Sequence, residues 1–153
     1  MNRLLLTLAI TTAVGSLLSS NPAAAQVLPP VKRAERVEIT AAPALELATD
    51  HLTIIRWTTN NPGRADVHYG IVHYGTDPKD LGQTAKNPIR LNRSHPETTF
   101  RVRIEGLKLQ TTYYYRVTSE ESSGRSDGVK STVNKFTTPG PGERIVPYPA
   151  QVP

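Results

Sequence analysis

Cysteine is absent from the 153-residue sequence. The folded chain therefore contains no disulfide bond, no thiolate nucleophile and no zinc site built on cysteine. A domain without such cross-links has to be stabilised by the burial of apolar side chains, and 37% of the residues are hydrophobic. A β-sandwich of roughly 100 residues meets this requirement, because it buries about 65% of the surface of its unfolded chain.

Residue patterns that form catalytic or metal sites are also missing. None of the four histidines stands in a His-x-His or Glu-x-x-His spacing. We interpret all four as surface or turn residues: His51, His68, His73 and His95. No serine lies in a Gly-x-Ser-x-Gly elbow, and there is no glycine-rich phosphate loop. We therefore expect no catalytic residue, no cofactor and no metal, and we expect that the protein is not an enzyme.

The charge is mildly basic, with 18 Lys and Arg against 13 Asp and Glu, a formal net charge of +5. Removal of Arg3 with a cleaved leader leaves 17 against 13, which is +4. The basic residues are spread along the chain and do not form the dense patch of a nucleic-acid-binding protein, so we expect no nucleic-acid partner. Weak attraction to an anionic polysaccharide or an anionic envelope is compatible with this charge.

The first 25 residues have the pattern of a secretory signal peptide. Arg3 supplies the positive charge, residues 4–18 carry no charge, and three alanines precede the expected cleavage after Ala25. The apolar run is shorter than the roughly 20 residues of a membrane span. We expect a secreted or periplasmic protein with no transmembrane segment after cleavage; the alternative is an uncut membrane anchor. Residues 26–34 predict an extended linker.

Alternation of apolar and polar residues predicts a series of short strands. It is clearest at 99–106, where Phe100, Val102 and Ile104 should face the core and Arg101, Arg103 and Glu105 the solvent. Further strands are expected at 52–58, 64–75, 113–117 and 129–137. A first strand is expected at 36–40, which Pro43 breaks or bulges before 44–48 resumes the pairing, and 84–92 predicts one weak strand or two, interrupted at Asn87-Pro88. In the last of these, Val133 and Phe136 are both buried only if the strand bulges.

Two further segments bear on which way the side chains of one strand point and on where the domain ends. Val-His-Tyr-Gly occurs at 67–70 and again at 72–75. This offset of five residues requires either a bulge at Gly70 or copies that face opposite ways. Residues 140–153 are rich in proline and predict a disordered or polyproline-like tail.

The segment 107–117 predicts a tight corner followed by a strand. Leu107 precedes Tyr113 by six residues, which is the spacing of a tyrosine corner, in which the phenol hydroxyl bonds back to the preceding loop. Trp57, the single tryptophan, is expected to anchor the core. The predicted structural core comprises Trp57, Phe100, Leu107, Tyr113, Tyr115 and Phe136.

These features resemble those of a fibronectin type III domain. Trp57 matches the tryptophan of that family's second strand, and the segment 136–139 resembles its closing strand. The leucine, threonine and tyrosine that precede its sixth strand are matched by Leu107, Thr111 and Tyr113. The resemblance covers residues 35–139 and implies an all-β, seven-stranded, immunoglobulin-like sandwich without a disulfide.

The segments 71–76 and 107–115 are also similar to the N-terminal fibronectin-like domain of bacterial purple acid phosphatases. Those enzymes carry a second, metal-binding domain, and its signatures of aspartates and asparagine–histidine pairs are absent from this sequence. The resemblance to the accessory domain therefore implies no phosphatase activity.

Two outward-facing groups are candidates for a binding surface. Arg56, Arg101 and Arg103 should share one sheet face, because the second and fifth strands of such a sandwich are neighbours. Tyr114 and Arg116 should point out of the other sheet, beside His68 or Tyr74. In both cases the alternative is an ordinary solvated or packed strand face.

We expect a non-catalytic binding, adhesion or envelope-associated module whose partner is a protein or an anionic polysaccharide. The alternative is a detached accessory domain that acts beside a purple-acid-phosphatase-like or glycan-active enzyme.

Overall fold

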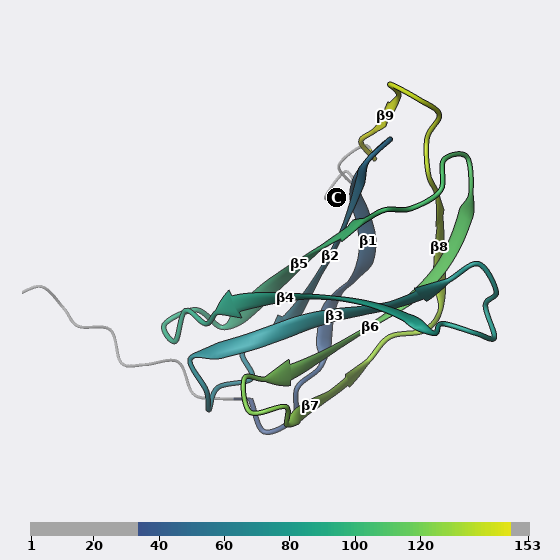
Figure 1. The fold of residues 1–153 in the computed structure, drawn as a ribbon. Helices are drawn as coiled ribbons and strands as arrows, with labels where there is room; N and C mark the ends of the chain where they lie inside the picture. The colour runs from purple at the N-terminus through teal and green to yellow at the C-terminus, as the bar shows by residue number, and fades with distance from the viewer. Residues whose placement is uncertain (1–33, 148–153) are drawn as a thin grey trace, which may run out of the picture.

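The computed structural model describes residues 34–147, which form two antiparallel β-sheets packed face to face (Figure 1). The expected signal peptide (1–25), the linker as far as residue 33 and residues 148–153 lie outside the described residues. No helix among the described residues is long and apolar enough to cross a membrane. The predicted all-β sandwich is confirmed.

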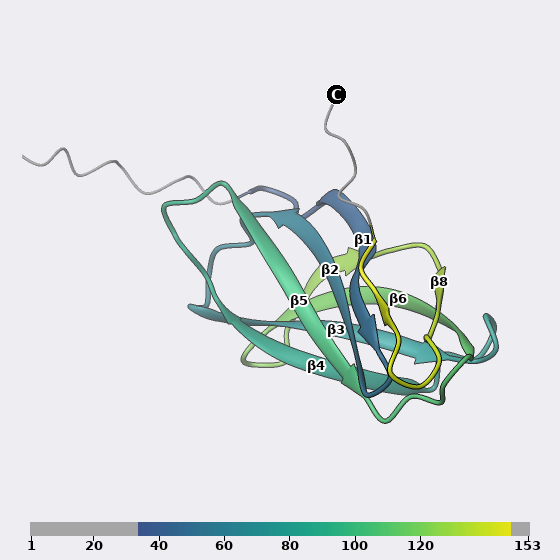
Figure 2. The same cartoon turned by 90° about the horizontal axis from the view of Figure 1, so that it is seen from above.

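The first sheet has the strand order β5-β2-β1-β9 and the second the order β4-β3-β6-β7, with β8 also paired to β6. Figure 2 shows from above how the first sheet lies across the second. The strands of the first sheet are β1 (Ile39–Thr49), β2 (Leu52–Asn60), β5 (Glu97–Glu105) and β9 (Arg144–Ile145). Those of the second are β3 (Val67–Gly75), β4 (Gln83–Arg90), β6 (Thr112–Glu121), β7 (Ser126–Lys130) and β8 (Asn134–Thr137).

The core is built around two aromatic rings of the first sheet. Trp57 on β2 and Phe100 on β5 are paired across the strands, and their rings stack with centroids 5.2 Å apart and an interplanar angle of 17°. Both side chains are almost completely buried. The other predicted core aromatics, Tyr113, Tyr115 and Phe136, belong to the same cluster, and Leu107 packs against it.

Gly70 lies directly opposite these rings on β3. A Cβ atom at this position would lie 2.8 Å from Trp57 Cη2 and 3.0 Å from Phe100 Cδ1. The pairing of β3 with β4 and β6 continues through Gly70 without a register shift. The two copies of Val-His-Tyr-Gly, five residues apart, therefore face opposite ways. Glycine is needed at position 70 because the rings of the facing sheet leave no room for a side chain.

The tyrosine corner forms as the spacing predicts. The backbone N–H of Lys108 donates a hydrogen bond to the Tyr113 hydroxyl at 3.0 Å. Thr138, just after β8, fastens the same turn: its hydroxyl donates to the Lys108 carbonyl at 2.6 Å and accepts from the Thr111 N–H at 2.9 Å. The corner thereby fixes where β6 begins and where β8 ends.

The expected final strand is divided into β7 and β8. Val129 and Phe136 are buried, whereas Val133 is 45% exposed between them, so the chain interrupts the strand instead of burying all three. Folded chain also extends past the expected boundary at residue 139. Pro139 and Gly140 are buried, and β9 pairs with β1 in the other sheet.

The contact at Gly70 generates a stability prediction. Gly70→Ala places a methyl group against two rigid rings, and we expect a loss of about 1–3 kcal/mol in the free energy of unfolding. Urea denaturation measures this loss. Gly82→Ala is the matched control, because its added Cβ meets the carboxylate end of the Asp80 side chain at 3.1 Å and no ring. Equal midpoints for Gly70→Ala and the parent would contradict the proposed fit.

Candidate functional site

The three candidate arginines of the first sheet lie on its outer face, which we call the arginine face (Arg56, Arg101, Arg103, Glu46 and Glu105). Arg56 and Arg101 are directly opposite each other in the β2–β5 pairing. The Glu46 carboxylate lies 3.7 Å from Arg56 Nε and 2.9 Å from Arg101 Nε. Arg103 pairs with Glu105. Each arginine of this face therefore already has an acidic partner.

Tyr114 and Arg116 lie on the opposite side of the sandwich, on the outer face of the second sheet. We call this the aromatic–cationic face; its members are Tyr69, Ile71, His73, Tyr114, Arg116, Lys130 and Lys135. The β3–β6 register places Arg116 opposite His73, and the β6–β8 register places Tyr114 opposite Lys135. The prediction that His68 or Tyr74 lies beside Tyr114 and Arg116 on this face is wrong, because both residues are buried on the inner face of β3.

The cations of this face lack acidic partners. Among residues 34–147, no ion pair involves Arg116, Lys130 or Lys135, and the buried Arg116 Nε has no hydrogen-bond acceptor. The nearby acid Glu120 is occupied by Lys86, whose ammonium also lies 4.1 Å from the centre of the Tyr69 ring. The face therefore carries unneutralised positive charge beside tyrosine rings.

His73 responds to this positive charge. Its Nε2 lies 2.9 Å from the Thr118 hydroxyl. Burial, and then the charges of Arg116 and Lys130, lower the pKa of His73 below 6.5. An anion bound beside Arg116 would oppose this effect and favour the protonated imidazole.

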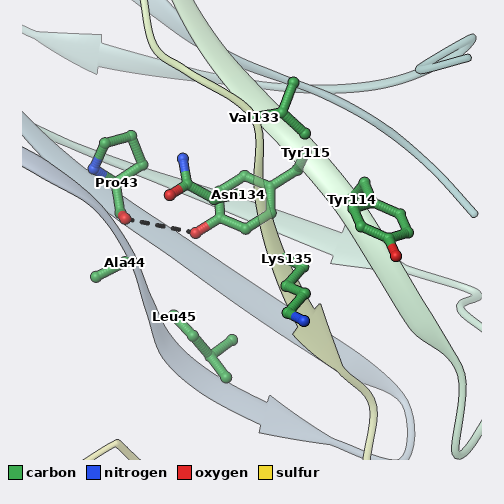
Figure 3. A pocket seen from close by; sticks show the side chains of 8 residues that line it. All are labelled: Pro43, Ala44, Leu45, Tyr114, Tyr115, Val133, Asn134 and Lys135. Atoms are coloured by element: carbon green, nitrogen blue, oxygen red, sulfur yellow. Dashed lines mark hydrogen bonds between the residues drawn. The ribbon is translucent and has the colours of Figure 1, made fainter. Parts of the chain in front are cut away.

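A pocket of about 530 Å³ opens at one edge of the aromatic–cationic face (Figure 3). It lies between β1 and β8, and the Tyr115 hydroxyl reaches across it to the Pro43 carbonyl at 3.5 Å. Its lining combines apolar side chains, two tyrosines, an amide and an ammonium: Pro43, Ala44, Leu45, Tyr114, Tyr115, Val133, Asn134 and Lys135.

The structure corrects the interpretation of His68, which is fully buried and not a surface or turn residue. Its Nδ1 lies 2.9 Å from Asp127 Oδ2, and its Nε2 lies 3.0 Å from the Gly63 carbonyl. A carbonyl oxygen only accepts, so Nε2 carries a hydrogen, and Nδ1 donates its own hydrogen to the carboxylate. In its protonated form His68 is therefore a buried imidazolium that donates to both Asp127 and the Gly63 carbonyl.

The pKa of His68 agrees with this assignment. Burial alone lowers the pKa, but the hydrogen bond and charge of Asp127, the Gly63 carbonyl and the charge of Glu121 outweigh burial and raise it above 6.5. Through these two contacts, the buried His68 side chain links the loop before β3, at Gly63, to Asp127 on β7. The sequence left two possibilities for the Val-His-Tyr-Gly repeat, a bulge at Gly70 or copies that face opposite ways. The second of these places one of the two histidines inside the sandwich, as the structure shows for His68.

Ser119, Asp127 and His68 have the residue types of a hydrolytic triad but not its connections. The Ser119 hydroxyl donates to the same Asp127 Oδ2 at 2.8 Å, and His68 directs its second nitrogen to a backbone carbonyl. The histidine is therefore not placed to take the serine proton. No group of three or more His, Cys, Asp or Glu side chains suited to a metal ion occurs in residues 34–147.

The shifted pKa values of His68 and His73 predict that the free energy of unfolding decreases on both sides of a pH optimum. The raised pKa of His68 adds stability that is complete below pH 6.5 and is lost as pH rises through the folded pKa. The lowered pKa of His73 adds stability that is present above pH 6.5 and is lost as pH falls through the folded pKa. We therefore expect the histidine contribution to the free energy of unfolding to be greatest near pH 6.5.

Urea titrations from about pH 5.5 to about pH 8.5 measure both limbs, and one proton limits each slope to about 1.4 kcal/mol per pH unit. His68→Gln should remove the alkaline decrease, and His73→Gln should remove the acid decrease. An alkaline limb that persists unchanged in His68→Gln would show that the buried pair is not its cause.

Comparison with known proteins gives one family match. Residues 43–138, from within β1 to the residue after β8, match the family described as purple acid phosphatase, N-terminal domain. No curated protein matches the sequence.

Solved structures that resemble the chain include a sensor domain, an FN5 domain and an fn3 domain. A long form of the sensor domain of the anti-sigma factor RsgI4 of Pseudobacteroides cellulosolvens has 19% identity and a TM-score of 0.47, over 70% of this chain and 93% of that one. The FN5 domain of Drosophila Lar has 18% identity and a TM-score of 0.34, over 67% and 92%. The fn3 domain of human collagen alpha-1(XX) has 19% identity and a TM-score of 0.37, over 80% and 99%.

The family match spans more than half of the chain and nearly all of the sandwich. It includes the stacked Trp57 and Phe100 and the tyrosine corner at Tyr113. The chain is a fibronectin-type-III-like β-sandwich, and it belongs to the purple acid phosphatase N-terminal domain family.

Proposed function

We propose that the protein is a non-catalytic binding module, secreted or periplasmic, that holds an acidic polysaccharide on its aromatic–cationic face. The observation that carries the proposal is Arg116, a half-buried arginine whose Nε has no acceptor among the described residues. A guanidinium without an acidic partner can bind a carboxylate or sulfate group through charge-assisted hydrogen bonds.

The contrast between the two outer faces supports this choice. On the arginine face, Glu46 and Glu105 already neutralise the arginines, so a polyanion would have to displace them. On the aromatic–cationic face, Arg116, Lys130 and Lys135 need no such exchange. Tyr69 and Tyr114 add ring surfaces beside these cations, and sugars pack well on such rings.

A second candidate role rests on the family match. The matched family is the N-terminal domain of purple acid phosphatases, so the chain is also a candidate accessory domain that acts beside a separate phosphoesterase or glycan-active enzyme. A neighbouring coding sequence for a metallophosphatase, and its co-purification with this protein, would favour that role. Metal-dependent turnover of a phosphoester by this chain alone would contradict a non-catalytic module.

The polysaccharide proposal predicts that binding depends on one face. Calorimetry with heparin and with polygalacturonate distinguishes sulfate from carboxylate recognition. Arg116→Gln should weaken binding by roughly tenfold, because it removes a charge-assisted hydrogen bond. Tyr114→Ala should weaken it less, through the loss of ring contact.

Matched double variants separate specific binding from net charge. Lys130→Gln with Lys135→Gln and Arg101→Gln with Arg103→Gln each remove two positive charges, from opposite faces. We expect only the first pair to reduce affinity clearly. An equal or larger loss in the second pair would place binding on the arginine face or reduce it to net charge, and the proposal would fail.

Proton linkage supplies an independent readout. Because a bound anion favours protonated His73, affinity should rise as pH falls below 6.5. His73→Gln should flatten this dependence. A parent protein whose affinity is constant with pH would argue against an anion seated beside Arg116.

A further inference from the structure

One edge of β8 has no strand beside it. Among the described residues, β8 pairs with β6 alone. The Thr138 N–H donates to the Thr111 carbonyl at 3.0 Å, and this contact continues the β6–β8 register. Because backbone groups alternate between the two sides of an antiparallel strand, the N–H and carbonyl groups of Lys135 and Thr137 point away from β6. These two residues therefore offer backbone donors and acceptors to a further strand.

The hydrogen bonds of β6 agree with this alternation. At the end of β6, the Ser122 N–H donates to the Val67 carbonyl at 3.0 Å, on the side of β3. The preceding Glu121 N–H donates to the Arg125 carbonyl at 2.8 Å, on the side of β7. Odd-numbered residues of β6 therefore bond toward β7 and β8. Lys135 lies opposite an even-numbered residue, so its backbone groups are on the far side of β8.

The free edge of β8 borders the 530 Å³ pocket (Figure 3). On the other side of the sandwich, the Arg103 N–H donates to Asn87 Oδ1 at 3.2 Å and joins β5 to β4. Across the pocket, the Tyr115 hydroxyl reaches the Pro43 carbonyl at 3.5 Å. From Ile39 to Leu47, β1 pairs with β2 alone among the described strands. The sandwich is therefore open on this side, where an extended segment can lie beside β8.

A strand added beside β8 would present its side chains alternately to two environments. The side chain opposite Lys135 lies on the outer surface of the second sheet, because Lys135 is itself paired with the outward-facing Tyr114. The neighbouring side chains of the added strand point into the pocket, whose apolar lining includes Leu45 and Val133. The positions that face the pocket therefore suit apolar side chains.

Charge decides which outward side chains fit. Among residues 34–147, neither Lys130 nor Lys135 has an acidic partner. An acidic side chain opposite Lys135 forms a cross-strand pair of opposite charge, whereas a basic one is repelled. A second copy joined through the same strand would bring another Lys135 to this edge, so the charge favours a different, acidic partner.

We propose that the β8 edge, which is the backbone of Lys135 and Thr137 with the pocket beside it, binds an extended peptide segment of a partner protein as an added strand. In this segment acidic and apolar side chains alternate. Main-chain hydrogen bonds hold the segment, the lysine selects its acidic side chains, and the pocket takes its apolar ones. The inference goes beyond polysaccharide binding, with which it shares Lys135 but not the backbone contacts.

Amide hydrogen exchange of the full chain, followed by nuclear magnetic resonance, tests the backbone contact. The probe is a synthetic peptide of alternating glutamate and valine. We expect the amides of Lys135 and Thr137 to exchange fast in the free protein and to be protected by the peptide. The amide of Phe136, which bonds to β6, should be protected in both states. Two control peptides, one with the same residues in two blocks and one of alternating lysine and valine, should bind about tenfold more weakly or less.

A matched pair of variants separates backbone pairing from charge. Lys135→Gln and Lys135→Pro remove the same charge, but only proline removes the N–H that faces the free edge, and it leaves the β6–β8 hydrogen bonds in place. We expect proline to weaken peptide binding by roughly tenfold relative to glutamine. Heparin should not distinguish the two variants, so the peptide and polysaccharide proposals fail separately. Urea denaturation checks that both variants fold, and the exchange measurement on the parent does not depend on them.

Four results would overturn the inference. The first is that the amides of Lys135 and Thr137 stay unprotected when the peptide is added. The second is equal binding of the alternating and block peptides, which would reduce the effect to net charge. The third is protection in the free protein that rises with protein concentration, which would mean that a second copy occupies the edge. The fourth is protection in the free protein at every concentration, which would mean that another segment of this chain occupies it.

Discussion

The close approach of Gly70 to the stacked rings of Trp57 and Phe100 is the constraint on which the arrangement of the sandwich depends. The two rings fill the space between the sheets, and the facing strand can come near only where it has no side chain. Because β3 passes this point without a bulge, its side chains alternate strictly on either side of it. His68 is thereby directed inward and His73 outward, which creates both the buried ion pair and the centre of the aromatic–cationic face.

The two outer faces show how little the number of cations says about binding. The arginine face has three arginines, but carboxylates from β1 and β5 lie beside them. The aromatic–cationic face has cations without acidic partners among the described residues, and after burial the charges of two of them help to lower the pKa of His73. A ligand gains most where charge and hydrogen-bonding capacity are unsatisfied, because it displaces no existing partner.

Much of the fold could be predicted because its signals are local. Alternation at 99–106 identified which side chains of β5 are buried, and the Leu107–Tyr113 spacing identified the corner. The candidate surfaces were less predictable. The spacing of residues along β2 and β5 placed three arginines together, but Glu46 reaches them only because an irregular β1 lies alongside. Asp127 lies 59 residues from His68, and no local pattern relates the two.

The sequence by itself determined the all-β architecture, the aromatic core and the absence of disulfides, because periodicity, turn residues and composition act over a few residues at a time. Tertiary structure alone decided which charges are paired, which histidine is buried and where the end of the chain returns. Those outcomes depend on contacts between strands that are distant in sequence, such as β9 against β1 and β3 against β7. Their energies are set by the burial and charge that the assembled sheets impose.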